Sequence, residues 1–289
     1  MSNGRHYPFV ETLKELRHQI IEATSRMKIT ADTSGMAENL FSSYIEPVIE
    51  HYEPIVSPLA SHRGDILYRA RKCIDGVPFD NLQDLYNPPS PSGRAKTLSN
   101  MPILYASSSM QTCLSEIDPK IGDLVNVVGL KYCNIEDGKF WFIGQLASFY
   151  KSNEHSRYVS EKQGLTGHAY FPERAKHSFI FQDSLINEIF STLSSQEDGY
   201  VLNRFLIDAI RTKLGHETLL RGVVFLSVKD SPGINFAIFG DAIEQLEQGQ
   251  INLLRITDID NYGFVSYEVL KNGRHENGKI EWPESEISY

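Results

Sequence analysis

The stretch Leu104-Tyr-Ala-Ser-Ser-Ser-Met-Gln-Thr-Cys-Leu-Ser-Glu116 carries two kinds of pattern, one directly after the other. Its first residues follow Pro102 as a short apolar run, which predicts a strand. Residues 110–117 fit the start of a helix. We therefore expect a strand that leads straight into a helix at this point of the fold.

Strand and helix patterns also lie on both sides of this stretch. Further strands are expected at residues 66–71, 124–130, 223–226 and 236–239. Helices, with apolar residues three or four positions apart, are expected at 9–21, at 40–49 with a bend or a break at Pro47, and at 202–210 with a stop at Gly215. Because strands and helices do not alternate strictly, we expect an α+β fold.

Prolines mark the expected boundaries of the chain. Two of them, at positions 54 and 58, follow the second helical pattern. We therefore expect an N-terminal helical accessory segment over residues 1–60 and one larger domain over residues 61–289. Within that domain, residues 76–102 are rich in proline and form a long irregular loop, a kind of segment that is usually functional or disordered.

Composition limits the possible functions. The chain has 289 residues, of which 41% are hydrophobic, so it can bury a sizeable core. Its net charge of −9 argues against sequence-independent binding to nucleic acid. The part from residue 241 onward holds ten acidic and four basic residues, and we expect a solvated end with modest strand content. The three cysteines lack CxxC spacing, and no signal peptide or membrane-spanning run is visible, so a cytoplasmic protein with reduced thiols is expected.

Motifs of metal sites and of common nucleotide sites are missing. The nine histidines show no HExxH or similar spacing, so we expect no metal. Neither GxGxxG nor GxxxxGK[ST] occurs, and Ser115-Glu116 is not part of a GxSxG turn. Cys113 lies on the predicted helix and is expected to pack in the core rather than to act as a nucleophile.

Four segments carry polar groups where a purely structural element would not need them. They are Tyr68-Arg69-Ala70-Arg71, Pro88-Pro-Ser-Pro-Ser-Gly-Arg94, Leu104 to Glu116, and Val223 to Asn235. In this order and spacing they resemble the RES family, which is named for an Arg, a Glu and a Ser in its active site. The matching positions, within about residues 64–240, are Tyr68-Arg69, Gly93-Arg94, Leu104-Tyr105, Glu116, Gly222 to Ser227, Gly233, Asn235 and Phe239.

The resemblance implies a fold and an activity. The fold would be an ADP-ribosyltransferase-like split β-sheet core with flanking helices, preceded by the N-terminal helical segment. The activity would be that of an enzyme that takes NAD as substrate and breaks its bond to nicotinamide, by phosphorolysis, hydrolysis or ADP-ribosyl transfer. Similar proteins include toxins of toxin–antitoxin pairs, so the resemblance implies a toxin or defence protein. The implied partners are NAD, a cognate antitoxin or regulatory protein, and a second copy in a homodimer.

The resemblance also implies roles for individual residues. The implied catalytic residues are Arg94, Tyr105, Glu116 and Ser227, and the implied NAD-binding residues are Arg69, Arg94, Tyr105, Gly233 and Asn235. These residue types suit the chemistry, because a carboxylate can stabilise the positive charge that develops on the ribose. Guanidinium groups bind pyrophosphate, an aromatic ring stacks on nicotinamide or ribose, and a glycine allows close approach of the backbone.

Two other hypotheses stay open. Ala95-Lys96 and Phe225 differ from the residues that are usual in the family, which leaves a catalytically inactive nucleotide-binding or regulatory module of the same fold. A structural hypothesis makes the chain a helical interaction protein whose strands are a scaffold, and it predicts no nucleotide binding. The sequence does not name the acceptor, which is water, phosphate or a macromolecule.

Overall fold

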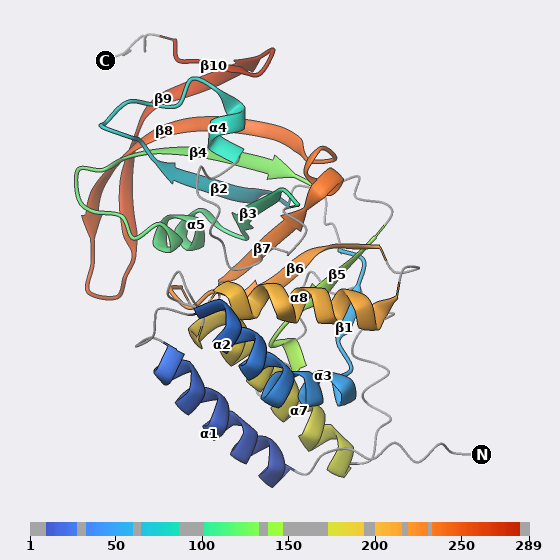
Figure 1. The fold of residues 1–289 in the computed structure, drawn as a ribbon. Coiled ribbons are helices and arrows are strands. Elements are labelled where there is room, and N and C mark those ends of the chain that lie inside the picture. Colours follow the sequence, from blue (N-terminus) through green and yellow to red (C-terminus); the bar gives the residue numbers. More distant parts are fainter. Residues whose placement is uncertain are drawn as a thin grey trace. The chain divides into compact units, whose positions relative to one another are not determined.

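The computed structural model describes residues 10–27, 33–59, 65–86, 101–132, 138–146, 173–193, 200–215, 219–230 and 233–283. The chain divides into two units. Unit 1 contains Met1–Ala60, Ser92–Met101 and Asp137–Phe225, and unit 2 contains Ser61–Pro91, Pro102–Glu136 and Leu226–Tyr289. Both units combine helices with strands, so the chain has mixed α and β structure, consistent with the expected α+β class (Figure 1).

Unit 1 consists mainly of helices. They are α1 (Val10–Met27), α2 (Thr33–Leu40), the π-helical turn η1 (Phe41–Ile45), α3 (Glu46–His51), α7 (Glu173–Glu188), η3 (Ile189–Leu193) and α8 (Tyr200–Leu214). Its strands are β1 (Ile55–Ser57), β5 (Lys139–Phe142) and β6 (Leu220–Leu226), in the order β1-β5-β6, with β1 antiparallel and β6 parallel to β5. The helical backbone is not broken at Pro47: the π-helical turn η1 ends at Ile45 and runs directly into α3, and Pro47 lies in the first turn of α3.

The N-terminal helices pack inside unit 1. Helix α1 contacts α7, while α2 and α3 contact α8. Leu13 and Ile20 on the apolar face of α1 are fully buried, as the three-to-four spacing predicts. Arg17 adds two hydrogen bonds of 2.6 Å from its guanidinium to the Glu188 carboxylate on α7. The described helices of the N-terminal segment, over residues 10–27 and 33–51, therefore pack with the helices that follow in unit 1.

Unit 2 contains an antiparallel sheet. Its strands are β2 (Leu67–Lys72), β3 (Ile103–Ser107), β4 (Leu124–Lys131), β7 (Ile234–Phe239), β8 (Glu247–Ile259), β9 (Val265–Glu276) and β10 (Lys279–Glu281). They lie in the order β7-β3-β2-β4-β8-β9-β10, and each pairs with its neighbour in antiparallel fashion. Its helical elements are α4 (Leu82–Tyr86), α5 (Met110–Glu116) and the 3-10 turn η5 (Gly240–Ile243).

Two expectations for unit 2 are wrong. The part of the chain after residue 241 was expected to have modest strand content, but β8 and β9 are 13 and 12 residues long. In β8, buried apolar side chains alternate with exposed polar ones, so the strand is half-buried. β9 is mostly exposed. The acidic residues of this part of the chain therefore fit on the solvent side of the two strands. The loop at 76–102 also contains α4, where Leu85 is buried.

Helix α5 is fixed on one face of this sheet. Ser109 caps its N-terminus, because its hydroxyl accepts a hydrogen bond from the Thr112 backbone N–H at 3.0 Å. The apolar side of α5 packs into a buried cluster made of Ala70, Cys113, Leu114, Val125, Val127, Leu254, Ile256 and Val265. The last residue of this fixed helix is Glu116, whose position is therefore set by the core.

Candidate functional site

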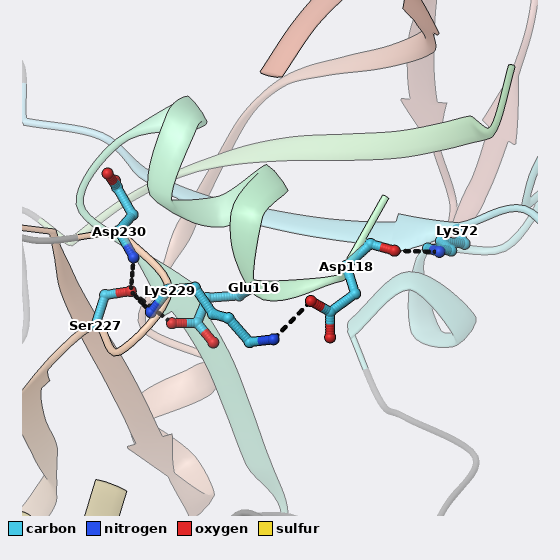
Figure 2. Close-up of polar contacts among 6 residues, drawn as sticks. All are labelled: Lys72, Glu116, Asp118, Ser227, Lys229 and Asp230. Atoms are coloured by element: carbon cyan, nitrogen blue, oxygen red, sulfur yellow. Dashed lines mark hydrogen bonds and ion pairs between the residues drawn. The ribbon is translucent and has the colours of Figure 1, made fainter. Parts of the chain in front are cut away.

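The Glu116 carboxylate collects hydrogen bonds from residues more than a hundred positions away. Its Oε1 atom accepts from Ser227 Oγ at 2.7 Å and from Asn235 Nδ2 at 2.6 Å. Figure 2 shows Glu116 at the end of α5, pointing toward the turn that carries Ser227. Within the part of the chain that the structure describes, Oε2 has no hydrogen-bond partner. One oxygen is thus held in place by the protein while the other can accept from a ligand.

Ser227 begins a tight turn at the end of β6. Its Oγ accepts hydrogen bonds from the backbone N–H groups of Lys229 and Asp230, at 3.2 and 2.9 Å. A hydroxyl has two lone pairs and one proton, so both lone pairs are used and the proton goes to Glu116. Ser227 is 7% exposed. These contacts make Ser227 a fixed donor to Glu116 rather than a free nucleophile.

Asn235 reaches Glu116 from the other side, at the start of β7. Its Oδ1 accepts a hydrogen bond from Ser107 Oγ at 2.7 Å, and its Nδ2 donates to Glu116. Ser107 and Asn235 are direct register partners in the β3–β7 pair, and both are 4% exposed. The result is a buried polar chain, Ser107 to Asn235 to Glu116, which we call the Glu116 chain.

Residues 227–230 and Gly233 are fastened to α5 by further contacts. Thr112 Oγ1 donates to the Asp230 carboxylate at 2.6 Å, and Lys229 Nζ donates to Asp118 Oδ1 at 2.6 Å (Figure 2 shows the second). Gly233 lies so close to α5 that a Cβ atom there would be 2.4 Å from Thr112 Oγ1. The close backbone approach expected at Gly233 is therefore made to α5.

Arg69 and Tyr105 lie on neighbouring strands, but their described contacts are not to Glu116, Ser227 or Asn235. The Arg69 guanidinium donates to the carbonyl of Tyr105 at 3.3 Å and to that of Leu85 at 3.4 Å. Burial lowers the pKa of Arg69 to about 10, so it stays charged at neutral pH. Among the described residues it forms no ion pair with a carboxylate, and its two hydrogen bonds go to backbone carbonyls.

Tyr105 lies two residues before Ser107 on β3, so its side chain is on the same face of the strand. Its backbone pairs with Ala237, as Ser107 pairs with Asn235. The Tyr105 side chain is partly exposed. This arrangement places a phenol on the face that carries the Glu116 chain. Arg94 and Gly93 lie outside the described residues.

Cys113 adjoins the site from the core. Burial raises the pKa of its thiol to about 12, the negative charge of Glu116 acts in the same direction, and the positive charge of Arg69 opposes it. The thiolate is the reactive form, so a buried neutral thiol is a poor nucleophile. The expectation that Cys113 packs in the core agrees with its 4% exposure.

Four residues around Glu116 were missed at the sequence level: Ser107, Thr112, Asp118 and Lys229. Thr112 could have been found, because it lies four residues before Glu116 and so shares one face of the predicted helix. Lys72 also contacts Asp118, through the carbonyl at 2.6 Å, and pairs with Asp123 at 2.9 Å. Two lysines at the C-terminal end of α5 complement the partial negative charge of its last carbonyls.

In the described ranges, no group of three or more His, Cys, Asp or Glu residues could hold a metal ion. None of the helices in the described part combines the length and the apolar character that a membrane crossing requires. Comparison of the whole chain with protein-family models, with curated proteins and with solved structures found no match in any of the three.

Proposed function

We propose that the chain is an NAD-consuming enzyme that breaks the bond between nicotinamide and ribose. The observation that carries the proposal is the Glu116 carboxylate, with Oε1 held by Ser227 and Asn235 and with Oε2 left for a ligand. Three residues that the RES resemblance selects from distant parts of the sequence thus meet at one point. A carboxylate held in this way suits a reaction that develops positive charge nearby.

In the proposed reaction the bond between nicotinamide N1 and ribose C1 breaks, and neutral nicotinamide leaves with the electron pair. Positive charge develops on C1, as in the cleavage of a glycoside. Glu116 Oε2 accepts a hydrogen bond from a ribose hydroxyl and stabilises this charge. Water, phosphate or a nucleophilic group of a macromolecule then bonds to C1, and a proton carried by the attacking atom is released to solvent. Ser227 and Asn235 keep the carboxylate from rotating, since each donates to Oε1.

The other expected site residues have supporting roles in this proposal. Arg69, charged and without a carboxylate partner among the described residues, would bind the pyrophosphate of NAD together with Arg94. Tyr105 would stack on nicotinamide or ribose. A protein of this activity would act as a toxin or in defence, in the cytoplasm where NAD is abundant, and a partner protein would mask the site. A homodimer remains part of the proposal.

Glu116→Gln tests the proposal, because it keeps the shape of the side chain and removes its charge. Purified protein is incubated with NAD, with and without phosphate, and free nicotinamide and the second product are identified by mass spectrometry. We expect release of nicotinamide to fall by about 10²–10³-fold, the usual loss when one preorganised charge-stabilising group is removed. Glu247→Gln is the matched control, since Glu247 is exposed in the same unit and pairs only at 3.6 Å with Lys131. A folded Glu116→Gln variant with wild-type rate refutes the assignment.

The second candidate is an inactive nucleotide-binding module of the same fold. It is favoured by the contacts of Arg69 with two backbone carbonyls, which already give this guanidinium a structural use. Isothermal titration with NAD separates the candidates when it is run beside the product assay. Binding without any release of nicotinamide supports the inactive module. If the protein neither binds NAD nor releases nicotinamide, the result supports the hypothesis of a helical interaction protein.

A further inference from the structure

Three consecutive serines between β3 and α5 have three different partners. Ser109 caps α5, and Ser108 Oγ accepts from the backbone N–H of Ile234 at 3.2 Å. Ser109 Oγ also contacts Thr112 Oγ1 at 2.7 Å, within α5 and its cap, whereas Ser107 donates its hydroxyl to the side-chain amide oxygen of Asn235 on β7. The RES resemblance selects Asn235 but not Ser107, so this hydroxyl has no assigned role.

The chemistry of the partners fixes the orientation of the Asn235 amide. An amide offers an acceptor oxygen at one end and two N–H donors at the other, whereas a carboxylate only accepts. Asn235 must therefore turn Nδ2 toward Glu116, which it approaches to 2.6 Å. Its Oδ1 then points into a buried region and needs a donor, and Ser107 Oγ supplies one at 2.7 Å.

We propose that Ser107 is a positioning residue for Glu116 and acts through Asn235. The donation from Ser107 satisfies Oδ1 only when Nδ2 faces Glu116, so it stabilises the productive orientation of the amide. That orientation holds Glu116 Oε1 and leaves Oε2 for the ligand. Ser107 touches neither the ligand nor the reacting atoms. Its effect on rate rests on the proposed function, while its effect on geometry does not.

The kinetic test is a double-mutant cycle of Ser107→Ala and Asn235→Ala, with Ser107→Thr as the conservative variant. We expect Ser107→Ala to lower kcat for nicotinamide release about tenfold, the range of one lost hydrogen bond, and to change KM less than about twofold. Ser107→Thr keeps the hydroxyl on a residue that strands accept, and it should restore most of kcat. In the Asn235→Ala background, Ser107→Ala should have no further effect on kcat, because its target is gone.

Ser115→Ala is the matched control. Ser115 precedes Glu116 on α5, and the one contact of its hydroxyl among the described residues is a 3.4 Å hydrogen bond accepted from Gln111, outside the Glu116 chain. We expect wild-type kcat from this variant. A merely structural role for Ser107 would give an additive cycle, with Ser107→Ala lowering kcat equally in both backgrounds. That result overturns the proposal.

Crystal structures of the same variants give a readout that does not depend on activity. In Ser107→Ala the Asn235 amide should move beyond hydrogen-bond distance of Glu116 Oε1, while Ser107→Thr should keep the contact. Should Ser107→Ala fail to fold, Ser107→Cys replaces it, since a thiol is only a weak donor. An unchanged Asn235–Glu116 distance in the variant without a strong donor overturns the proposal. If wild-type protein releases no nicotinamide, the proposed function fails and this distance alone decides the role of Ser107.

Discussion

Gly233→Ala is the substitution whose effect can be worked out most directly from the structure. A Cβ atom at position 233 would lie 2.4 Å from Thr112 Oγ1 and 2.6 Å from Thr112 Cγ2. It would also lie 2.6 Å from the carbonyl oxygen of Asp230, which belongs to the same turn. Thr112 has little room to yield, because it is 1% exposed and is hydrogen-bonded to both Ser109 and Asp230.

The expected loss of stability follows from these distances. Overpacking a filled site costs about 1–3 kcal/mol, and a contact with backbone that cannot rotate away belongs at the upper end of that range. Thr112→Ala removes two of the three contacts but loses the 2.6 Å hydrogen bond to Asp230. The free energy of unfolding that the double variant loses should therefore be about 1 kcal/mol smaller than the sum of the losses in the two single variants, as expected for residues in contact.

Urea denaturation of the four proteins measures these free energies. Trp282 is a suitable fluorescent reporter, since its indole N–H donates to the Phe79 carbonyl inside unit 2. The turn also carries Ser227, so the Gly233→Ala variant should release nicotinamide more slowly even where it stays folded. Substitutions at exposed positions usually change the free energy of unfolding by no more than about 0.5 kcal/mol. A Gly233→Ala protein whose free energy of unfolding differs from wild type by no more than that would refute this account of the glycine.

Three more predictions concern the buried groups and the N-terminal helices. Tyr52→Phe should destabilise the protein by about 1–3 kcal/mol in urea, because the buried Tyr52 hydroxyl donates to Asp183 at 3.0 Å and accepts from Trp141 at 3.3 Å; an unchanged midpoint would contradict this. The pKa of Cys113 is raised from 9.0 to about 12 in the folded chain, so the unfolded chain ionises first and stability should fall as pH rises from about 9 to about 12. The loss should reach roughly 4 kcal/mol and should shrink in Cys113→Ala, as followed by urea titrations across this pH range. Deletion of residues 1–60 should abolish cooperative unfolding of unit 1, because Lys213 of α8 donates to the carbonyls of Ile49 and Glu50 and the faces of α7 and α8 would be uncovered; a deletion variant with a wild-type calorimetric transition would show that these helices are dispensable.

Local patterns in the sequence predicted part of the fold, while α7, β1 and β5 were not predicted. The passage from β3 to α5, the stop of α8 at Gly215 with its φ of +77°, and the strands on either side of the 227–233 turn are confirmed. Each depends on periodicity or on turn chemistry that acts over a few residues. The two long strands after residue 241 were underestimated, because their many charged side chains lie on exposed positions of the ladder.

The candidate site could be predicted only in part. Glu116, Ser227 and Asn235 were selected through the resemblance, and they do meet. The contribution of Ser107 and the packing of Thr112 on Gly233 could not be predicted, because both depend on which strands are neighbours. A serine in a run of three serines gives no local sign of a partner 128 residues away.

The order of the Glu116 partners along the chain has a consequence for synthesis on the ribosome. Ser227 and Asn235 follow Glu116 by 111 and 119 residues. At a translation rate of about 5–20 residues per second, roughly 5–25 s pass between the synthesis of the carboxylate and that of its two donors. During this interval a nascent chain carries Glu116 without the groups that orient it. Whatever reaction the site performs, the polypeptide gains that ability only after Asn235 has been synthesised.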